Sequence, residues 1–155
     1  MSVRVAVALG SNLGNRQRHL SFARDRLARL LLNFRMSSAI ETDPVDVPDV
    51  QPAFLNAAAV GDTTLGPDDF FHALQDIETA AGRERPFPGA ARTLDLDLIL
   101  FGTTILHESQ LEIPHPRFRE RRFVLEPLAA IAPDLRDPVT SLTIAELLAR
   151  LPPAK

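Results

Sequence analysis

The sequence contains no cysteine, no tryptophan and no tyrosine, and lysine occurs only once, at Lys155. Without cysteine, the chain has no disulfide framework, no thiolate metal site and no cysteine nucleophile. Sixteen arginines supply every other basic side chain. The chain therefore has no interior lysine for a Walker-type phosphate loop, a Schiff base or a general base, and anions must be bound by arginine, backbone amides or a metal ion.

Long apolar runs and an excess of positive charge are also missing. No stretch approaches the ~18 apolar residues that cross a bilayer, and the first residues read as a strand rather than as an export signal. The net charge of −3 argues against a general nucleic-acid- or membrane-binding surface. With 155 residues, 45% of them hydrophobic, we expect a single domain over residues 1–155, and a monomer in the cytoplasm.

The spacing of apolar residues predicts an α+β fold with a ferredoxin-like βαββαβ order. The strands are expected at residues 3–9, 35–42, 54–60 and 94–101, and the helices at 20–34 and 67–82. This order is typical of the split β-α-β arrangement, in which an antiparallel sheet carries both helices on one face.

A short hairpin near residues 105–113 and a C-terminal helical extension are expected to follow. The extension is predicted as helix over 118–132, with a break near Pro127, and again over 143–151. Thr143 and Glu146 match a capping box at the start of the last helix.

Three loops have compositions that bear on function. Residues 10–15 form a Gly/Ser/Asn-rich cluster between the first strand and helix, which we interpret as a tight turn because it matches neither nucleotide-loop pattern. Residues 43–52 are acidic and contain three prolines, and residues 83–92 are rich in arginine, glycine and proline. The latter two loops are natural lids over a substrate site.

Two acidic residues interrupt the strongest predicted strand. Leucines occupy alternate positions from 94 to 100, so Asp95 and Asp97 share the opposite face, which Ile99 and Phe101 continue. Their Cα atoms are expected about 6.5–7 Å apart, which suits a pair of Mg²⁺ ions. The alternative is an amphipathic edge strand whose aspartates simply face water.

Arginines flank this strand on both sides. Three precede it, at Arg83, Arg85 and Arg92, and four follow Pro114-His115-Pro116, at Arg117, Arg119, Arg121 and Arg122. If the strand is central, its two connections converge over the aspartates. An acidic pair with arginines is typical of a metal–polyphosphate site, whereas the alternative is a solvated helix face and a structural histidine.

Taken in order, four segments resemble the 6-hydroxymethyl-7,8-dihydropterin pyrophosphokinase family of folate biosynthesis. They are Gly-Ser-Asn-Leu-Gly at 10–14, Phe-Leu-Asn-Ala-Ala at 54–58, Arg-Thr-Leu-Asp-Leu-Asp at 92–97, and Pro-His-Pro through Arg-Arg-Phe at 114–123. The resemblance extends from Val5 to about Pro133. It implies a ferredoxin-like fold and transfer of pyrophosphate from ATP to the pterin hydroxymethyl oxygen, with release of AMP.

The resemblance also implies roles for individual residues. Asp95 and Asp97 would hold two Mg²⁺ ions, and with Arg83 and Arg92 they would form the catalytic set. The ATP site would include Gln75, Glu78, Arg83, Arg92, Leu98, His115 and Arg121. The pterin would lie between Phe54 and Phe123, with Asn56 on its polar edge and the backbone around Thr42, Pro44 and Val45 completing the pocket.

Two other functions stay open. One is a divergent family member that binds pterin or nucleotide without turnover, because Phe-Pro-Gly-Ala-Ala at 87–91 stands where the family commonly has Trp-Gly-Pro. The other is a ferredoxin-like RNA-binding module. The lack of tyrosine and tryptophan and the negative net charge disfavour RNA binding.

Overall fold

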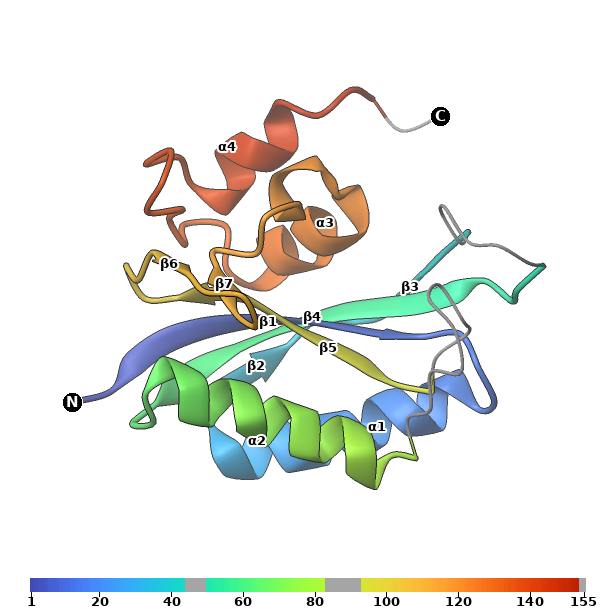
Figure 1. The fold of residues 1–155 in the computed structure, drawn as a ribbon. Helices are drawn as coiled ribbons and strands as arrows, with labels where there is room; N and C mark the ends of the chain where they lie inside the picture. The colour runs from blue at the N-terminus through green and yellow to red at the C-terminus, as the bar shows by residue number, and fades with distance from the viewer. Residues whose placement is uncertain (44–49, 83–92, 154–155) are drawn as a thin grey trace.

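The computed structural model describes residues 1–43, 50–82 and 93–153. The strands are β1 (Val3–Ser11), β2 (Leu32–Met36), β3 (Ile40–Thr42), β4 (Phe54–Thr63), β5 (Asp95–Phe101), β6 (Leu106–His107) and β7 (Glu112–Ile113). The helices are α1 (Arg16–Leu30), α2 (Pro67–Ala80), α3 (Arg122–Ile131) and α4 (Ile144–Ala149), and a 3₁₀ turn spans Phe118–Glu120. The main sheet has the order β2-β4-β1-β5 and is antiparallel throughout, while β6 and β7 form a separate hairpin (Figure 1).

Helices cover both faces of the main sheet. On one face, α1 and α2 pack apolar side chains such as Leu27 and Leu74 against the strands, and on the other face α3 and α4 pack Leu125 and Ile144 (Figure 1). The predicted ferredoxin-like fold with a C-terminal helical extension is confirmed. No helix in the described parts of the chain is both long and apolar enough to span a bilayer.

The first helix ends earlier than predicted. It stops at Leu30 because Leu31 has an extended backbone, and β2 begins at the next residue. Leu31 and Phe34 fit a helical stripe and a strand equally well on spacing alone. Phe34 is part of a strand because β2 pairs with β4.

The expected strand over 35–42 is also divided. β2 and β3 pair with β4 one after the other along the same edge. Ser37 lies at the interruption, where its N–H donates to the carbonyl of Ala58 at 2.8 Å and its Oγ accepts from the Ala58 N–H at 2.9 Å. The Ser37 hydroxyl thus accepts the hydrogen bond that a backbone carbonyl would accept in a regular strand, at the interruption between β2 and β3.

The strand that carries the acidic pair lies at the edge of the sheet rather than at its centre. Its register against β1 shifts after Leu98, so Ile99 is an additional residue on β5. Leu100 therefore packs with Ile99 beneath α3, whereas Phe101 packs on the α2 side, with its ring centroid 6.2 Å from that of Phe70. The predicted alternation is correct through Ile99, which shares the face of the aspartates, and wrong for Leu100 and Phe101.

The C-terminal extension differs from prediction at its break. Pro127 lies inside α3 without ending the helix, and the break falls instead at Arg121, between the 3₁₀ turn and α3. Pro127 is buried, and this burial outweighs the hydrogen bond that its missing N–H removes. The predicted capping box is confirmed, because Thr143 and Glu146 each accept a hydrogen bond from the other's backbone N–H.

A buried carboxylate organises the turn between α3 and α4. Asp137 is 0% exposed and accepts hydrogen bonds from the Arg119 guanidinium, the Thr140 hydroxyl and the Val139 N–H. Burial by itself raises the pKa of Asp137, but these hydrogen bonds outweigh it and hold the pKa below its ordinary value. The ionised form therefore stabilises the folded protein.

This linkage predicts a pH-dependent contribution to stability. Because the pKa of Asp137 is lower when folded, its stabilisation is fully present above the unfolded value of about 3.9 and is lost as pH falls through the folded value. Urea denaturation is expected to show Asp137→Asn destabilised by about 3 kcal/mol at pH 7, with the difference from wild type shrinking below about pH 4.

Asp25→Asn is the control, since Asp25 belongs to an exposed ion pair on α1. It is expected to cost less than about 1 kcal/mol at either pH. A difference between wild type and Asp137→Asn that stays constant down to about pH 2 would contradict the assigned linkage.

Candidate active site

The two aspartates of β5 lie on the sheet face that α3 covers. Asp95 pairs with Gly10 and Asp97 pairs with Ala8, and directly paired residues of antiparallel strands direct their side chains to the same face. Ala8 packs in the hydrophobic cluster beneath α3, so the face that carries Ala8 and both aspartates is the one that α3 covers. Both aspartates are half-buried. The structure thus places the predicted pair on one face, at the rim of the core.

One residue of β1 connects this pair to the other half of the site. Gly10 pairs with Asp95 on β5 and with Asn56 on β4, so these three residues form a row across the sheet. At about 4.8 Å between strands, the Cα atoms of Asp95 and Asn56 lie roughly 10 Å apart. A Cβ atom on Gly10 would lie 3.4 Å from Asn56 Oδ1 and 3.6 Å from Phe54 Cδ1. The glycine therefore keeps the floor between the aspartates and the amide open.

The predicted pterin residues meet at the β4 end of this row. Asn56 is 5% exposed, and its Nδ2 donates to Thr42 Oγ1 on β3 at 2.6 Å. Phe54 lies two residues earlier on the same face of β4, and Phe123 packs at the start of α3 against the cluster above that face. The structure thus supplies one aromatic ring from the sheet and one from the covering helix.

Arg121 connects the two predicted substrate sites. It is the residue just before α3, and its guanidinium carbon lies 5.6 Å from the centre of the Phe123 ring. A cation at this distance is attracted to the face of the ring. A predicted phosphate contact therefore touches a predicted pterin contact.

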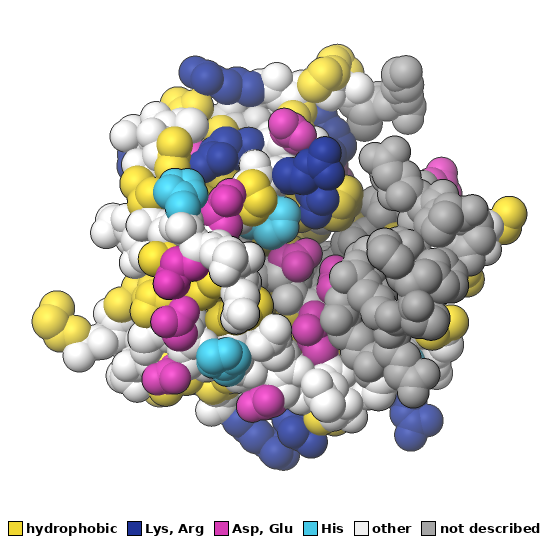
Figure 2. Space-filling view, in the orientation of Figure 1, with side chains coloured by type: hydrophobic (Ala, Val, Ile, Leu, Met, Phe, Trp, Pro, Cys, Tyr) yellow, Lys and Arg dark blue, Asp and Glu magenta, His cyan; other side chains and the backbone are white. Residues whose placement is uncertain are grey.

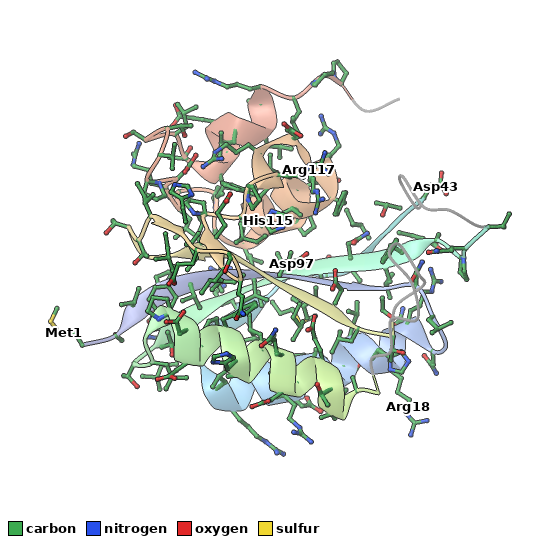
Figure 3. All side chains as sticks on the ribbon, in the orientation of Figure 1. Met1, Arg18, Asp43, Asp97, His115 and Arg117 are labelled. Atoms are coloured by element: carbon green, nitrogen blue, oxygen red, sulfur yellow. The ribbon has the colours of Figure 1, made fainter. Side chains whose placement is uncertain are left out.

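Backbone hydrogen bonds hold His115 beside β5. Its N–H donates to the carbonyl of Ile99 at 3.0 Å, and its Nδ1 accepts from the Arg117 N–H at 3.2 Å. In Figure 3 the labelled His115 lies between Asp97 on the sheet and Arg117, which lies at the height of α3. Since Nδ1 is an acceptor, the neutral ring carries its proton on Nε2.

The surroundings of His115 favour this neutral form. Burial lowers the pKa of His115, and the charges of Arg121 and Arg117 lower it further, while Asp95 and Glu112 oppose the shift. At neutral pH the ring is an uncharged donor through Nε2. Such a donor can bind a phosphate oxygen without adding charge to the site.

A cleft of about 150 Å³ opens at the edge of β5. It is lined by Phe71, Leu96, Asp97, Leu98, Gln110, Leu111, Glu112, His115 and Pro116. Acidic, basic and histidine side chains gather on the face between α2 and the C-terminal helices (Figure 2). A second cavity of about 130 Å³ lies beside α1, where Arg24 is its one charged lining residue, so the β5 cleft is the better candidate for charged ligands.

Glu78 contacts the strand rather than lining this cleft. It projects from α2, is 8% exposed, and its Oε2 accepts from the Leu96 N–H at 2.7 Å. Leu96 lies between the two aspartates on an edge strand, where an outward N–H needs a partner. Of the other predicted nucleotide residues, Leu98 lines the cleft and Gln75 is exposed on α2.

Several predictions fall outside the described residues or stay unassigned. Pro44, Val45, Arg83, Arg85, Arg92 and the segment 87–91 lie outside the described part of the chain. Arg119, whose role the sequence leaves open, contacts Asp137, while the side chain of Arg117 is exposed.

Sequence reasoning missed the role of Gly10. We interpreted it as part of a turn, but β1 extends through Ser11 and Gly10 is a paired strand residue. The available signal was the run of small residues on one face of the strand, at Ala6, Ala8 and Gly10. Such a run indicates that a ligand or another chain segment approaches the strand closely.

The donor set of the acidic pair fits Mg²⁺. Two carboxylates on one strand face supply hard oxygen ligands, and Mg²⁺ in nucleotide sites commonly takes one or two carboxylates together with substrate phosphates. Among the described residues, no group of three or more histidine, aspartate or glutamate side chains forms a complete metal cage.

Comparisons with known proteins agree with this geometry. The family model described as 7,8-dihydro-6-hydroxymethylpterin-pyrophosphokinase matches residues 6–133. The chain is 44% identical over 154 residues to the 2-amino-4-hydroxy-6-hydroxymethyldihydropteridine pyrophosphokinase of Pseudomonas aeruginosa, covering 98% of this chain and 94% of that protein. It is 41% identical over 142 residues to the protein of the same name from Bacillus subtilis, covering 87% and 81%.

Solved structures show the same fold. The crystal structure of wild-type HPPK-DHPS of Plasmodium falciparum with pteroate superposes with a TM-score of 0.78 at 14% identity. The match covers 97% of this chain but only 44% of that chain, so the chain spans less than half of the longer protein.

Removing the contact between α2 and β5 is expected to loosen the strand that carries the aspartates. Glu78→Ala leaves the Leu96 N–H without its acceptor in a buried position, which costs about 2 kcal/mol. Glu78→Gln keeps a carbonyl oxygen at the same place and is expected to lose less than half as much. Denaturant unfolding of both variants measures the difference, and equal losses would show that this hydrogen bond is not the relevant contact.

Proposed function

The chain belongs to the 7,8-dihydro-6-hydroxymethylpterin-pyrophosphokinase family, and we propose that it transfers pyrophosphate from ATP to the hydroxymethyl oxygen of 6-hydroxymethyl-7,8-dihydropterin, releasing AMP. Its class is that of an ATP-dependent pyrophosphokinase of folate biosynthesis. The observation that carries the proposal is the row Asp95–Gly10–Asn56. It sets an acidic pair and a buried amide on one sheet face, with a side-chain-free position between them.

The ATP half of the site is assigned to the β5 side. Asp95 and Asp97 would hold two Mg²⁺ ions, which when bound neutralise phosphate charge and stabilise the charge that develops on the transferring group. His115 donates from Nε2 and Arg121 offers a planar guanidinium, so both suit phosphate oxygens. Arg83 and Arg92 stay predictions for the same phosphates.

The pterin half is assigned to the β4 side. The amide of Asn56 has a donor and an acceptor for the polar edge of the heterocycle, and its bond to Thr42 fixes its orientation. Phe54 and Phe123 stack on the two faces of the ring, at about 0.5–1.5 kcal/mol per stack beyond burial. Pro44 and Val45 are predicted to complete the pocket.

The reaction needs no nucleophile from the protein. The attacking group is the pterin alcohol, and the protein contributes by holding it in line with ATP and by stabilising charge. Side chains of the row are suited to this because they lie on paired strands rather than on separate loops. The single domain and the cytoplasmic monomer also stay predictions.

Activity is expected to depend on both aspartates. With purified protein, Mg²⁺, ATP and the pterin, we expect AMP formation, and we expect Asp95→Ala and Asp97→Ala each to lower kcat by on the order of 10²-fold or more. Asp25→Ala, on the exposed side of α1, is the control and is expected to keep wild-type rates.

The same assay separates the alternatives. Full activity in both aspartate variants would remove the metal-pair assignment. Tight binding of ATP and pterin without any AMP would identify a binding protein without turnover, as the altered segment 87–91 suggests. Salt-sensitive binding of single-stranded RNA instead would support the RNA-binding alternative.

The open floor at Gly10 is expected to determine pterin affinity. In Gly10→Ala the new methyl group would stand on the floor in ordinary contact with Asn56 and Phe54 and take space that the pterin is proposed to fill, so we expect the KM for the pterin to rise about tenfold, with a smaller change in the KM for ATP. Gly66→Ala is the matched control, because a Cβ there has nothing within 4 Å. Equal effects of Gly10→Ala on both substrates would contradict the division of the site into two halves.

A further inference from the structure

The pair Arg119–Asp137 is the best-formed ion pair in the described part of the chain. Arg119 Nε donates to Asp137 Oδ2 at 2.6 Å, and Arg119 Nη2 donates to Oδ1 at 3.0 Å. This is a fork-to-fork contact, in which the planar guanidinium fixes both distance and orientation. Asp137 is 0% exposed, while the Arg119 side chain is 26% exposed.

The carboxylate belongs to a turn that is closed by its own hydrogen bonds. The Asp137 N–H donates to the Leu142 carbonyl at 2.8 Å, and the Asp137 carbonyl accepts from the Ser141 N–H at 2.8 Å. Its side chain also accepts from the Val139 N–H at 3.0 Å and the Thr140 hydroxyl at 2.7 Å. Arg119 therefore docks on an acceptor that the turn holds in place.

The arginine belongs to a short segment that is anchored on one side by the buried Phe118 ring and held by single-turn backbone hydrogen bonds such as Glu120 N–H to the Arg117 carbonyl at 3.1 Å. Arg119 is the middle residue of the three-residue 3₁₀ turn Phe118–Glu120, and turns of this kind have poor hydrogen-bond geometry. The turn ends at Arg121, whose N–H donates to the Phe118 carbonyl at 3.2 Å and whose carbonyl accepts from Val124 at the start of α3. Whatever fixes the turn also fixes the backbone of Arg121.

We propose that the Arg119–Asp137 pair is a positioning device that sets Arg121 for ATP. The pair joins the arginine-bearing segment to the C-terminal extension, and Asp137 lies beyond residues 6–133 that the family model matches. The extension is then part of the ATP site through Arg119, although Arg119 itself points to Asp137. The inference rests on the proposed function, since that function assigns Arg121 to the phosphates.

The test measures equilibrium binding of MgATP in the absence of pterin. Arg119→Lys keeps the charge but loses the fork, and we expect it to weaken MgATP binding about tenfold. Asp137→Asn, which is nearly isosteric, is expected to act in the same direction. Arg4→Lys is the matched control, because Arg4 makes a similar two-bond contact with Asp62 at the far end of β1, and it is expected to leave MgATP binding unchanged.

A double-mutant cycle shows whether the pair acts through Arg121. In the Arg121→Ala background, Arg119→Lys is expected to have no further effect on MgATP binding. An undiminished effect in that background, or a lower melting temperature with unchanged MgATP binding in both Arg119→Lys and Asp137→Asn, would overturn the proposal and leave a purely structural ion pair. If Arg121→Ala itself binds MgATP normally, the assignment of Arg121 in the proposed function is wrong, and the positioning role is wrong with it.

Discussion

Repulsion between Asp95 and Asp97 is the constraint around which the site is arranged. Carboxylates about 5 Å apart repel by roughly 3 kcal/mol at an effective dielectric near 20, so a mobile strand would separate them or leave them in bulk water. Here the backbone of β5 is held along both edges. Pairing with β1 fixes one side, and on the other side Glu78 binds the Leu96 N–H and His115 binds the Ile99 carbonyl. These contacts hold the two carboxylates next to each other on one strand face, which is what the proposed metal site requires.

The two faces of the sheet have different roles: one sets the strand register and the other carries the proposed site. On the α1 and α2 face, large apolar side chains such as Leu96 and Leu98 set the register, because a shift of one residue would move the aspartates into that apolar layer and the leucines to the opposite face. On the α3 face, β1 presents the small residues Ala6, Ala8 and Gly10 between Arg4 and the end of the strand. The alanines are covered by α3, whereas Gly10 has no side chain, and Asn56 lies across it from Asp95.

Sequence periodicity predicted what depends on local spacing, and it failed where distant pairing decides. The shared face of Asp95 and Asp97 follows from their alternation with leucines, and the structure places them so. The bulge at Ile99 and the edge position of β5 depend on how many residues β1 offers opposite, which no local pattern encodes. The early end of α1 has the same origin, because Phe34 suits either period and β4 decides.

The site shows the same difference between features that a local motif predicts and features that depend on distant contacts. The residues proposed to bind metal, phosphate and pterin were accessible from motif resemblance, since the motifs are short and occur in a fixed order. The contact of Arg119 with Asp137, 18 residues away, was not accessible, because an arginine among other arginines has no sequence feature that marks its partner. Only the fold distinguishes an arginine that holds the site from one that faces a ligand.

Because lysine is nearly absent from the chain, the positive charges near the proposed site come from arginine. Arginine stays charged at any pH that a folded protein tolerates, so the cationic part of the site does not titrate. Burial and the charge of Arg121 lower the pKa of His115, so the neutral imidazole is favoured at neutral pH. The site is then adjusted by position rather than by protonation, and the ion pairs and strand contacts that fix position have a direct effect on chemistry.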